Sequence, residues 1–236
     1  MGSGASIPSG MRFQTILFDL DGTLLDHLPA IHASYAHTLP QLGLPAPTRE
    51  QVRRVIGGGL ENAMRRFVSE ADLPRALQIY RAHWDRTMLA GATLMPGAGE
   101  LLRALHARGC TLAVLTNKHG PSSRAVCRHL GIAPLLRGVT GAEDTPWLKP
   151  DARLTAHVLA ALDAEPATAC LVGDSPFDAE TARNGRLAAF LVATGTHASA
   201  ELAAAGAEHV YPDLHSLARG VFGLRLKAAP PDDGGL

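Results

Sequence analysis

An acidic pair lies near the start of the chain, in the segment FDLDGTLLD at residues 18–26. Asp19 and Asp21 flank a single leucine and follow the apolar residues of a candidate buried strand. Two carboxylates held close together in a partly dry site repel each other, so they need a cation or a shared proton to coexist. We therefore expect a positive partner for this pair elsewhere in the sequence.

A second acidic pair, Asp174 and Asp178, follows the most apolar strand candidate, in the segment VGDSPFD at residues 172–178. The two aspartates are about one helical turn apart. Oxygen ligands of this kind suit Mg²⁺, which binds through one or two carboxylates and several waters. The alternative is that Asp174 or Ser175 only caps a helix.

Two polar segments complete the set of candidates. Thr116 and Asn117 stand where another apolar strand ends, and a hydroxyl with backbone N–H groups there can hold a phosphate oxygen. Lys149 precedes Pro150, which favours an extended backbone and places the lysine at a junction between a strand and a helix. Each segment alone is also ordinary turn or loop chemistry. Lysine is rare here, because only residues 118, 149 and 227 are lysines, and this favours a role for Lys149.

The elements that must position these residues alternate along the second half of the chain. Short β-rich runs alternate with longer helical patterns from residue 95 onward, which is typical of βαβ units and a parallel sheet. Ligands of such sheets bind at the carboxyl ends of the strands, where the candidate residues stand. The predicted strands are 15–20, 111–116, 138–142, 169–174, 188–193 and 209–212, and the predicted helices are 97–108, 121–130, 151–163, 177–184, 199–205 and 213–220.

Residues 27–94 have a different character. They contain no strand candidate, whereas helical patterns recur at 29–39, 48–56, 60–69 and 74–90, so we expect an inserted helical module. The remaining segments, 11–26 and 95–225, are expected to form the α/β core. Residues 1–10 and 226–236 are expected to be disordered, because they are rich in small residues, Gly, Pro and Asp.

Composition narrows the class of protein. The chain has 236 residues, 46% of them hydrophobic, and a formal net charge of zero, which predicts a soluble globular protein without nucleic-acid or membrane partners. Its three cysteines are scattered, which favours free thiols in a reducing cytoplasm. The sequence leaves a monomer and a homodimer both open.

The order of these residues resembles that of the haloacid dehalogenase-like hydrolase superfamily: two acids, a threonine, a lysine and two further acids, each at the end of a strand. The resemblance covers residues 13–215 and implies a Rossmann-like, doubly wound parallel sheet with an inserted α-helical cap at 27–94. Within the insert, the segment RRVIGGGL at residues 53–60 resembles phosphoglycolate phosphatase-like members.

The resemblance implies a role for each aspartate. Asp19 would be the nucleophile that forms an aspartyl-phosphate, and Asp21 would be the general acid and base. Mg²⁺ would be the cofactor and would answer the charge problem of the clustered acids. Its ligands would be Asp19, the backbone carbonyl of Asp21 and Asp174, with Asp178 in or near the second shell.

The other candidates would hold the substrate. Thr116, Asn117 and Lys149 would bind phosphoryl oxygens, and Thr116 and Lys149 would also take part in catalysis. Gly22 would allow a close approach of the backbone, and Thr23 would stabilise the turn. In the cap, Gly58 and Arg53 would meet a substrate carboxylate or hydroxyl, although a plain loop with solvated arginines is the alternative.

The leading hypothesis is an Mg²⁺-dependent phosphatase for a small phosphorylated metabolite, with 2-phosphoglycolate favoured. A phosphonate hydrolase of this superfamily needs a cap lysine, and residues 27–94 contain none. A haloacid dehalogenase is disfavoured because its corresponding position usually differs from Asp21. A sugar-phosphate mutase similar to β-phosphoglucomutase is the runner-up, because Ile31 stands where its cap histidine is expected, with His32 one place away. A non-catalytic binding or regulatory protein usually loses acids that are all present here.

Overall fold

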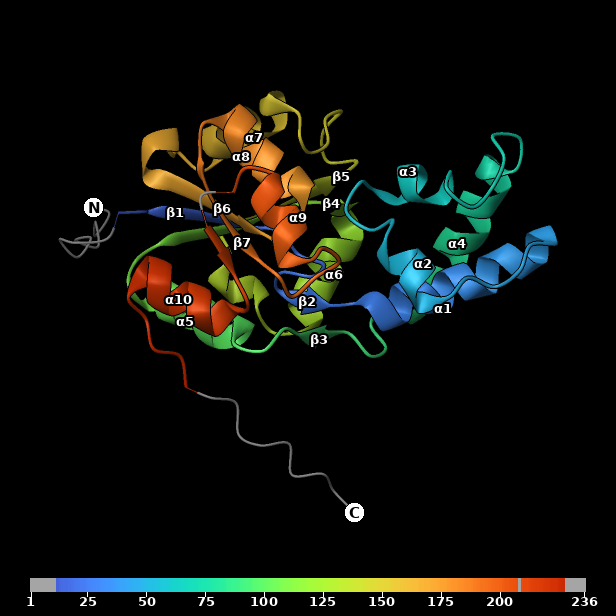
Figure 1. Cartoon of the computed structure of the whole chain (residues 1–236), viewed down its shortest axis with the longest axis horizontal. Helices are drawn as coiled ribbons and strands as arrows, with labels where there is room; N and C mark the ends of the chain where they lie inside the picture. The colour runs from blue at the N-terminus through green and yellow to red at the C-terminus, as the bar shows by residue number, and fades with distance from the viewer. Residues whose placement is uncertain (1–11, 208, 228–236) are drawn as a thin grey trace, which may run out of the picture.

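A parallel sheet forms the centre of the larger lobe in the computed structural model, which describes residues 12–207 and 209–227 (Figure 1). Over these residues the sheet has six strands in the order β5-β4-β1-β6-β7-β8. The chain builds outward from β1 on one side and then returns to build on the other, which is the doubly wound arrangement that the sequence predicts. The strands are β1 (Thr15–Phe18), β4 (Thr111–His119), β5 (Gly138–Ala142), β6 (Ala169–Gly173), β7 (Ala188–Val192) and β8 (His209–Tyr211).

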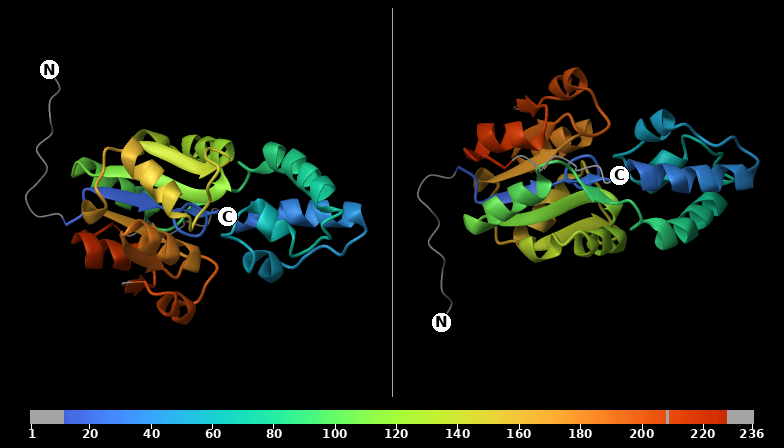
Figure 2. Two further views of the ribbon diagram at one scale, coloured as in Figure 1. Left: turned by 90° about the horizontal axis from the view of Figure 1, so that it is seen from above. Right: turned by 90° about the horizontal axis from the view of Figure 1, so that it is seen from below.

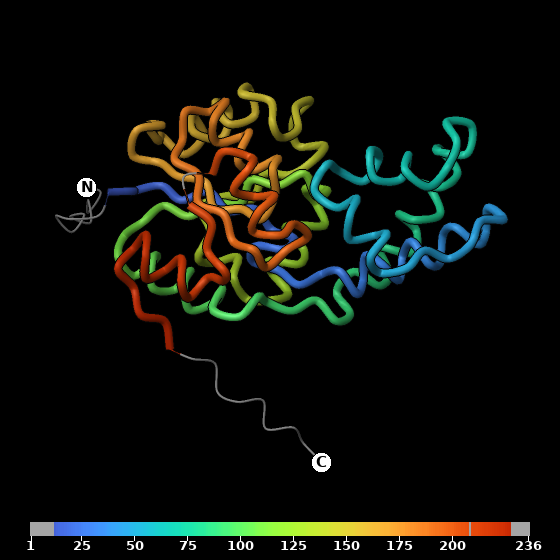
Figure 3. Tube along the Cα trace, in the orientation of Figure 1, coloured from blue at the N-terminus to red at the C-terminus, as the bar shows by residue number. Residues whose placement is uncertain are grey.

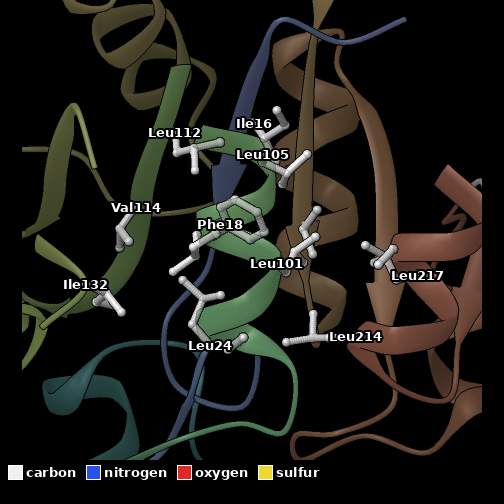
Figure 4. Packing of buried hydrophobic residues seen from close by; sticks show 14 of the residues in the cluster. Ile16, Phe18, Leu24, Leu101, Leu105, Leu112, Val114, Ile132, Leu214 and Leu217 are labelled. Carbon is white, nitrogen blue, oxygen red and sulfur yellow. The ribbon is translucent and has the colours of Figure 1, made fainter. Parts of the chain in front are cut away.

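Alternating side chains of the central strands bury both faces of the sheet. In β1, Ile16 and Phe18 belong to one buried cluster, whereas Leu17 belongs to the cluster on the opposite face. Figure 4 shows the first cluster, in which Phe18 lies among leucines of the covering helices. The first face is covered by α5 (Ala98–Ala107), α6 (Gly120–His129) and α10 (Leu214–Phe222), the second by α7 (Ala152–Ala161) and α8 (Pro176–Gly185), and α9 (Ser199–Ala204) packs near β7.

The register of the three central strands places their carboxyl ends level. Phe18 of β1 pairs with Val114 of β4 on one side and with Val172 of β6 on the other. The residues that follow these positions therefore emerge together at one edge of the sheet. This register is what gathers the acidic and polar candidates of three distant segments.

Residues 28–92, which we call the helical lobe, lie beside the carboxyl edge of the sheet (Figure 2). The structure has a helix at each of the four places where the periodicity predicts one. Tyr35, Met64, Tyr80 and Trp84 are buried in a hydrophobic cluster of the lobe's own residues. The helices are α1 (Leu28–Thr38), α2 (Arg49–Arg53), α3 (Leu60–Met64) and α4 (Leu73–Thr87), and short 3₁₀ turns occur at Leu39–Leu42 and, in the larger lobe, at Ala133–Leu135 and Pro166–Thr168.

The chain passes between the two lobes through a small antiparallel ribbon of β2 (Leu25–Asp26) and β3 (Thr93–Leu94). Figure 3 shows the two crossings as neighbouring segments of the tube. The sequence predicts no strand within 27–94, and β3 corrects this prediction. A strand of two residues is too short to show the alternation by which strands are recognised.

The ends of the chain need a brief account. Residues 1–11 and 228–236 lie outside the described residues, and with them most of the segments expected to be disordered. Leu226, which was included in that expectation, packs partly buried against the main core cluster. Cys110, Cys127 and Cys170 are buried, and none of them forms a disulfide. No helix in the described part of the chain is long and apolar enough to span a membrane.

Candidate active site

Five predicted site residues meet in one buried cluster at the carboxyl edge of the sheet. Asp19 follows β1, Thr116 lies in β4, and Asp174 follows β6, while Lys149 and Asp178 come from the adjoining loop and helix. All five side chains are buried, with exposed fractions from 0% for Asp178 to 6% for Asp19. Charged groups are almost never buried this deeply without a partner.

Lys149 is the positive partner that the first acidic pair requires. Its Nζ lies 2.8 Å from Oδ1 of Asp19 and donates a hydrogen bond of 2.6 Å to Oδ1 of Asp178. Burial would lower the pKa of Lys149, but the charges of Asp178 and Asp19 raise it above its usual value. The lysine is therefore an ammonium ion locked between two acids.

Asn117 fixes the backbone that carries this lysine. Its Oδ1 accepts a hydrogen bond of 2.8 Å from the Lys149 N–H, and its Nδ2 donates one of 3.1 Å to the Lys149 carbonyl. The same Nδ2 lies 3.0 Å from the carbonyl oxygen of Gly57, to which it also donates. The Asn117 side chain thus joins the lysine loop to the helical lobe.

Asp178 is fully engaged within the larger lobe. Its Oδ2 accepts hydrogen bonds from the N–H groups of Asp174 and Ser175, at 3.2 and 3.0 Å, and from the Ser175 hydroxyl at 2.6 Å. Its Oδ1 is taken by Lys149. Asp178 therefore caps α8 and also orients the loop that presents Asp174.

The negative charges of Asp19 and Asp174 are only partly balanced by the surrounding residues. Burial raises the pKa of Asp19 to about 6 against the opposing charge of Lys149. Burial also raises the pKa of Asp174 well above its usual range, and the nearby Asp19 and Asp178 add to this. Asp174 accepts hydrogen bonds from the Thr23 hydroxyl at 2.8 Å and the Thr196 N–H at 3.4 Å, whereas Asp19 shares the Lys149 ammonium with Asp178.

These residues fit a divalent cation. Ligand oxygens of Asp19, Asp174 and Asp178 all lie within 4.8 Å of one another. Three carboxylates face one ammonium there, so the cluster has an excess of negative charge when ionised. A hard divalent cation with oxygen ligands removes that excess. Asp19 and Asp174 have oxygens to offer it, whereas those of Asp178 are occupied by hydrogen bonds.

Close backbone packing fixes the Asp174 carboxylate. Gly22 has a φ of +87°, and a Cβ there would lie 2.4 Å from Oδ2 of Asp174. Gly195, in the loop after β7, approaches even more closely, since its Cβ would lie 1.7 Å from the same oxygen. Sequence reasoning found Gly22 but missed Gly195, because the segment ATGTHAS at 193–199 reads as an ordinary loop.

We expect Gly195→Ala to weaken divalent-cation binding by about 10- to 100-fold, the size of effect seen when the surroundings of a ligand are disturbed. The added methyl group must push the Asp174 carboxylate away from Asp19. Calorimetric titration of the metal-free protein with MgCl₂ measures this. Gly138→Ala is the matched control, because a Cβ at Gly138 meets nothing within 4 Å. Equal affinities for the two variants would contradict the prediction.

Asp21 lies apart from the carboxylate cluster and has its own partners. Oδ1 and Oδ2 accept hydrogen bonds from Nζ of Lys118 at 3.0 and 2.8 Å, and Nδ1 of the buried His27 lies 3.5 Å from Oδ1. Burial would raise the pKa of Asp21, but Lys118 and His27 hold it well below the usual range. The Asp21 carboxylate is therefore held by Lys118 and lies outside the group of acids that could bind the cation.

The cluster opens into a cleft of about 550 Å³ between the two lobes. Asp19, Asp21, Thr116 and Asn117 line it from the sheet side. The helical lobe contributes an apolar and aromatic wall, made of Ile31, Tyr35, Ile56, Leu60, Tyr80 and Trp84. A concave site with an apolar wall and a few convergent polar groups is the usual form of a small-molecule site.

Contacts at the rim hold the helical lobe over this cleft. Arg81 of α4 donates a hydrogen bond of 2.7 Å to Glu143, and Nε1 of Trp84 donates one of 3.2 Å to the Ser122 hydroxyl. With the contact between Asn117 and Gly57, these join α4 and the glycine loop to the larger lobe. The leaving group of a substrate would therefore be enclosed.

Of the two predicted cap residues, Gly58 lies at the cleft and Arg53 does not. Gly58 lines the cleft, as the glycine-rich segment suggests. Arg53 is not among the lining residues, because its Nε donates a hydrogen bond of 3.0 Å to the neighbouring Glu50. Arg65 lines the cleft instead, and sequence reasoning missed it. Thr23 and Lys149 are also absent from the lining, since both lie behind the acids that they support.

Comparison with known proteins agrees with this architecture. Residues 16–192 match the family model of the haloacid dehalogenase-like hydrolases. A phosphoglycolate phosphatase of Rhodospirillum rubrum is 34% identical over 215 residues, which cover 86% of this chain and 89% of that protein. The tyrosine-protein kinase PtkA of Mycobacterium tuberculosis is 33% identical over 178 residues, which cover 75% of this chain but only 61% of the relative.

A solved structure shows the same fold. The crystal structure of a predicted phosphoglycolate phosphatase from Haemophilus somnus superposes with a TM-score of 0.83 at 24% identity, covering 89% of this chain and 98% of that one. The family model spans most of the sheet and the whole helical lobe, and the four sequence segments that suggested the resemblance converge in one site. The chain therefore belongs to the haloacid dehalogenase-like hydrolase family.

Proposed function

We propose that this protein is an Mg²⁺-dependent phosphatase that hydrolyses a small phosphomonoester through an aspartyl-phosphate on Asp19. The observation that carries the proposal is the buried carboxylate of Asp19, which lines the cleft, belongs to the carboxylate cluster and has its Oδ1 2.8 Å from the Lys149 ammonium. A carboxylate that an ammonium holds in place at the cleft is positioned to attack a bound phosphorus atom.

The chain's own residues support two displacements. In the first, Asp19 forms a bond to phosphorus as the bond to the leaving oxygen breaks, and Asp21 donates a proton to that oxygen. For this donation Asp21 must first take up a proton, so the negative charge of the bound ester has to raise its pKa above the low value that Lys118 and His27 impose. In the second, water attacks the aspartyl-phosphate, Asp21 takes the proton of that water, and the carboxylate of Asp19 is released with inorganic phosphate. Lys118 stabilises the ionised form of Asp21, which the second step requires.

Other groups stabilise the phosphoryl oxygens. Thr116 and the backbone at Asn117 lie beside Asp19 at the cleft, and Lys149 supplies a fixed positive charge behind it. Mg²⁺ bound by Asp19, Asp174 and the backbone carbonyl of Asp21 would offset the negative charge of the phosphate. Fixed charges of this kind supply most of the catalysis in phosphoryl transfer.

Hydrolysis has more support than the mutase alternative. A sugar-phosphate mutase of this family is expected to use a cap histidine and a cap lysine, and residues 27–94 contain no lysine. Ile31 lines the cleft, whereas the neighbouring His32 does not and bonds instead to the Pro47 carbonyl at 2.9 Å. A purely regulatory protein has no need for all of the acids that converge here.

We further propose that the substrate is a small phosphorylated metabolite in the cytoplasm, with 2-phosphoglycolate favoured. Relatives named phosphoglycolate phosphatase, at 34% and 32% identity, support this choice. The enclosed cleft is consistent with a small substrate, and the buried cysteines, which form no disulfide, are consistent with the cytoplasm.

A phosphate-release assay tests the function. We expect turnover of 2-phosphoglycolate with MgCl₂ and a loss of about 10²-fold or more after treatment with EDTA, because the charge stabilisation by a metal is worth several kcal/mol. Activity should return when MgCl₂ is added in excess. A panel of sugar phosphates, analysed for both free phosphate and isomerised product, separates hydrolase from mutase. The proposal would be overturned if no compound of the panel released phosphate.

A further inference from the structure

Lys118 is a cation at the cleft with a largely buried side chain. In the proposed mechanism it only stabilises the ionised form of Asp21. Its side chain is 8% exposed, and the residue lines the cleft. Nζ contacts both oxygens of Asp21 and lies 4.5 Å from the centre of the Trp84 ring. An ammonium held against the face of an indole and against a carboxylate is firmly located.

Lys118 lies at the end of the site where the leaving group of the substrate would be bound. Asp21 must reach the leaving oxygen to donate its proton, and Lys118 touches both oxygens of Asp21. Lys149 lies on the other side, with Asp19 and Asp178. The two buried lysines therefore address different ends of a phosphomonoester.

The arginines of the cleft are committed elsewhere. Arg65 binds Glu61 at 2.7 Å and Glu70 at 3.1 Å, and Arg81 binds Glu143 at 2.7 Å. These pairs are partly exposed, so they lie toward the rim. Among the described lysines and arginines that line the cleft, Lys118 is thus the one that contacts Asp21.

Resting on the proposed function, we propose that Lys118 binds a carboxylate of the substrate and selects phosphorylated hydroxy acids. An ammonium group has three N–H donors, and Asp21 occupies two of them. The third can meet a carboxylate attached to the carbon that bears the ester oxygen. Trp84 and Tyr80 line the cleft beside it, and in such water-poor surroundings an ion pair is strong.

The same geometry disfavours neutral leaving groups. A substrate with a hydroxyl in place of the carboxylate would displace water from the Lys118 ammonium without supplying a charge. Sites built around a buried polar group reject analogues that leave the group unpaired. Lys118 would therefore determine specificity as well as orientation.

A pair of matched substrates tests the proposal. The carbon that bears the phosphate ester carries a carboxylate in 2-phosphoglycolate and a hydroxymethyl group in 2-hydroxyethyl phosphate, and the two compounds are otherwise the same. We expect the wild-type protein to prefer 2-phosphoglycolate by about 10²-fold or more in kcat/KM, since removing one partner of a buried charge pair leaves the other charge unpaired. Lys118→Met should remove most of this preference, with the larger effect in KM, whereas Lys118→Arg should keep part of it.

Controls separate recognition from a purely structural role. Lys227→Met replaces an exposed lysine and should change neither substrate. Should Lys118→Met lower turnover of both substrates equally, Lys118 serves only to hold Asp21, and the proposal is overturned. Equal wild-type turnover of the two substrates would also overturn it, while Mg²⁺-dependent phosphate release would leave the proposed phosphatase function intact.

One measurement needs no variant and covers the case in which Lys118→Met does not fold. With 2-hydroxyethyl phosphate as the substrate of the wild-type protein, glycolate should inhibit competitively at least about tenfold better than ethylene glycol, because only glycolate carries the carboxylate. Equal inhibition by the two compounds would contradict the assignment of Lys118.

Discussion

Replacing Asp19 by asparagine is expected to lower kcat by on the order of 10⁴-fold or more, because loss of a covalent nucleophile removes the whole two-step route. The amide keeps the shape of the carboxylate but is a poor nucleophile. It also removes one of the acids that crowd the buried cluster, where burial raises the pKa of Asp19 to about 6. We therefore expect the free energy of unfolding to be unchanged or higher.

Two measurements establish this result. Steady-state phosphate release gives kcat, and acid quenching after mixing with ³²P-labelled substrate shows whether label stays on the polypeptide. Wild type should trap label, and Asp19→Asn should trap none. Asp163→Asn, at an exposed position far along the chain, is the matched control and should behave as wild type. Normal turnover by Asp19→Asn would exclude the covalent route.

Replacing Lys149 by methionine is expected to lower the free energy of unfolding by about 3–5 kcal/mol, the usual cost of leaving a buried charge without its partner. Lys149 is 4% exposed and contacts Asp19 and Asp178 together. Methionine fills a similar volume, so lost charge rather than lost packing dominates. Activity should fall by about 10²-fold or more, since the phosphate also loses a fixed cation.

Urea unfolding followed by circular dichroism in EDTA measures the stability change without interference from metal binding. The double variant Lys149→Met with Asp178→Asn should recover part of the lost stability, because it removes one of the two stranded acids. Lys227→Met, on the exposed surface, should leave the unfolding midpoint unchanged. A Lys149→Met protein as stable as wild type would show that the buried acids do not depend on this ammonium.

The core of the site could be predicted because strand ends carry positional information. An apolar run that stops at Asp19 or Asp174 shows where a parallel strand reaches the carboxyl edge, and topology then brings such ends together. The structure places both acids side by side at that edge, and Thr116 of β4 joins them. Lys149 could be singled out only because lysine is scarce in this sequence.

The rest depends on which way side chains point, and a sequence does not specify this. The sequence gives Lys118 no role, because its contact with Asp21 spans 97 residues of chain. The sequence assigns no role to His27, which is buried beside Asp21 in the structure. Arg53 turned to a nearer acid, Glu50, one helical turn away. No sequence pattern marks Gly195, because the reason for a glycine there is its close approach to the Asp174 carboxylate in the folded protein.

The two-stranded ribbon of β2 and β3 has a consequence for how such enzymes diversify. Leu25 pairs with Leu94, so the chain leaves and re-enters the larger lobe at neighbouring points about 5 Å apart. A segment whose ends meet in this way can be exchanged for another of any length without stretching the sheet. Grafting a foreign helical segment between His27 and Thr93 would therefore change the chamber while keeping Asp19, Lys149, Asp174 and Asp178, which contact one another within the larger lobe.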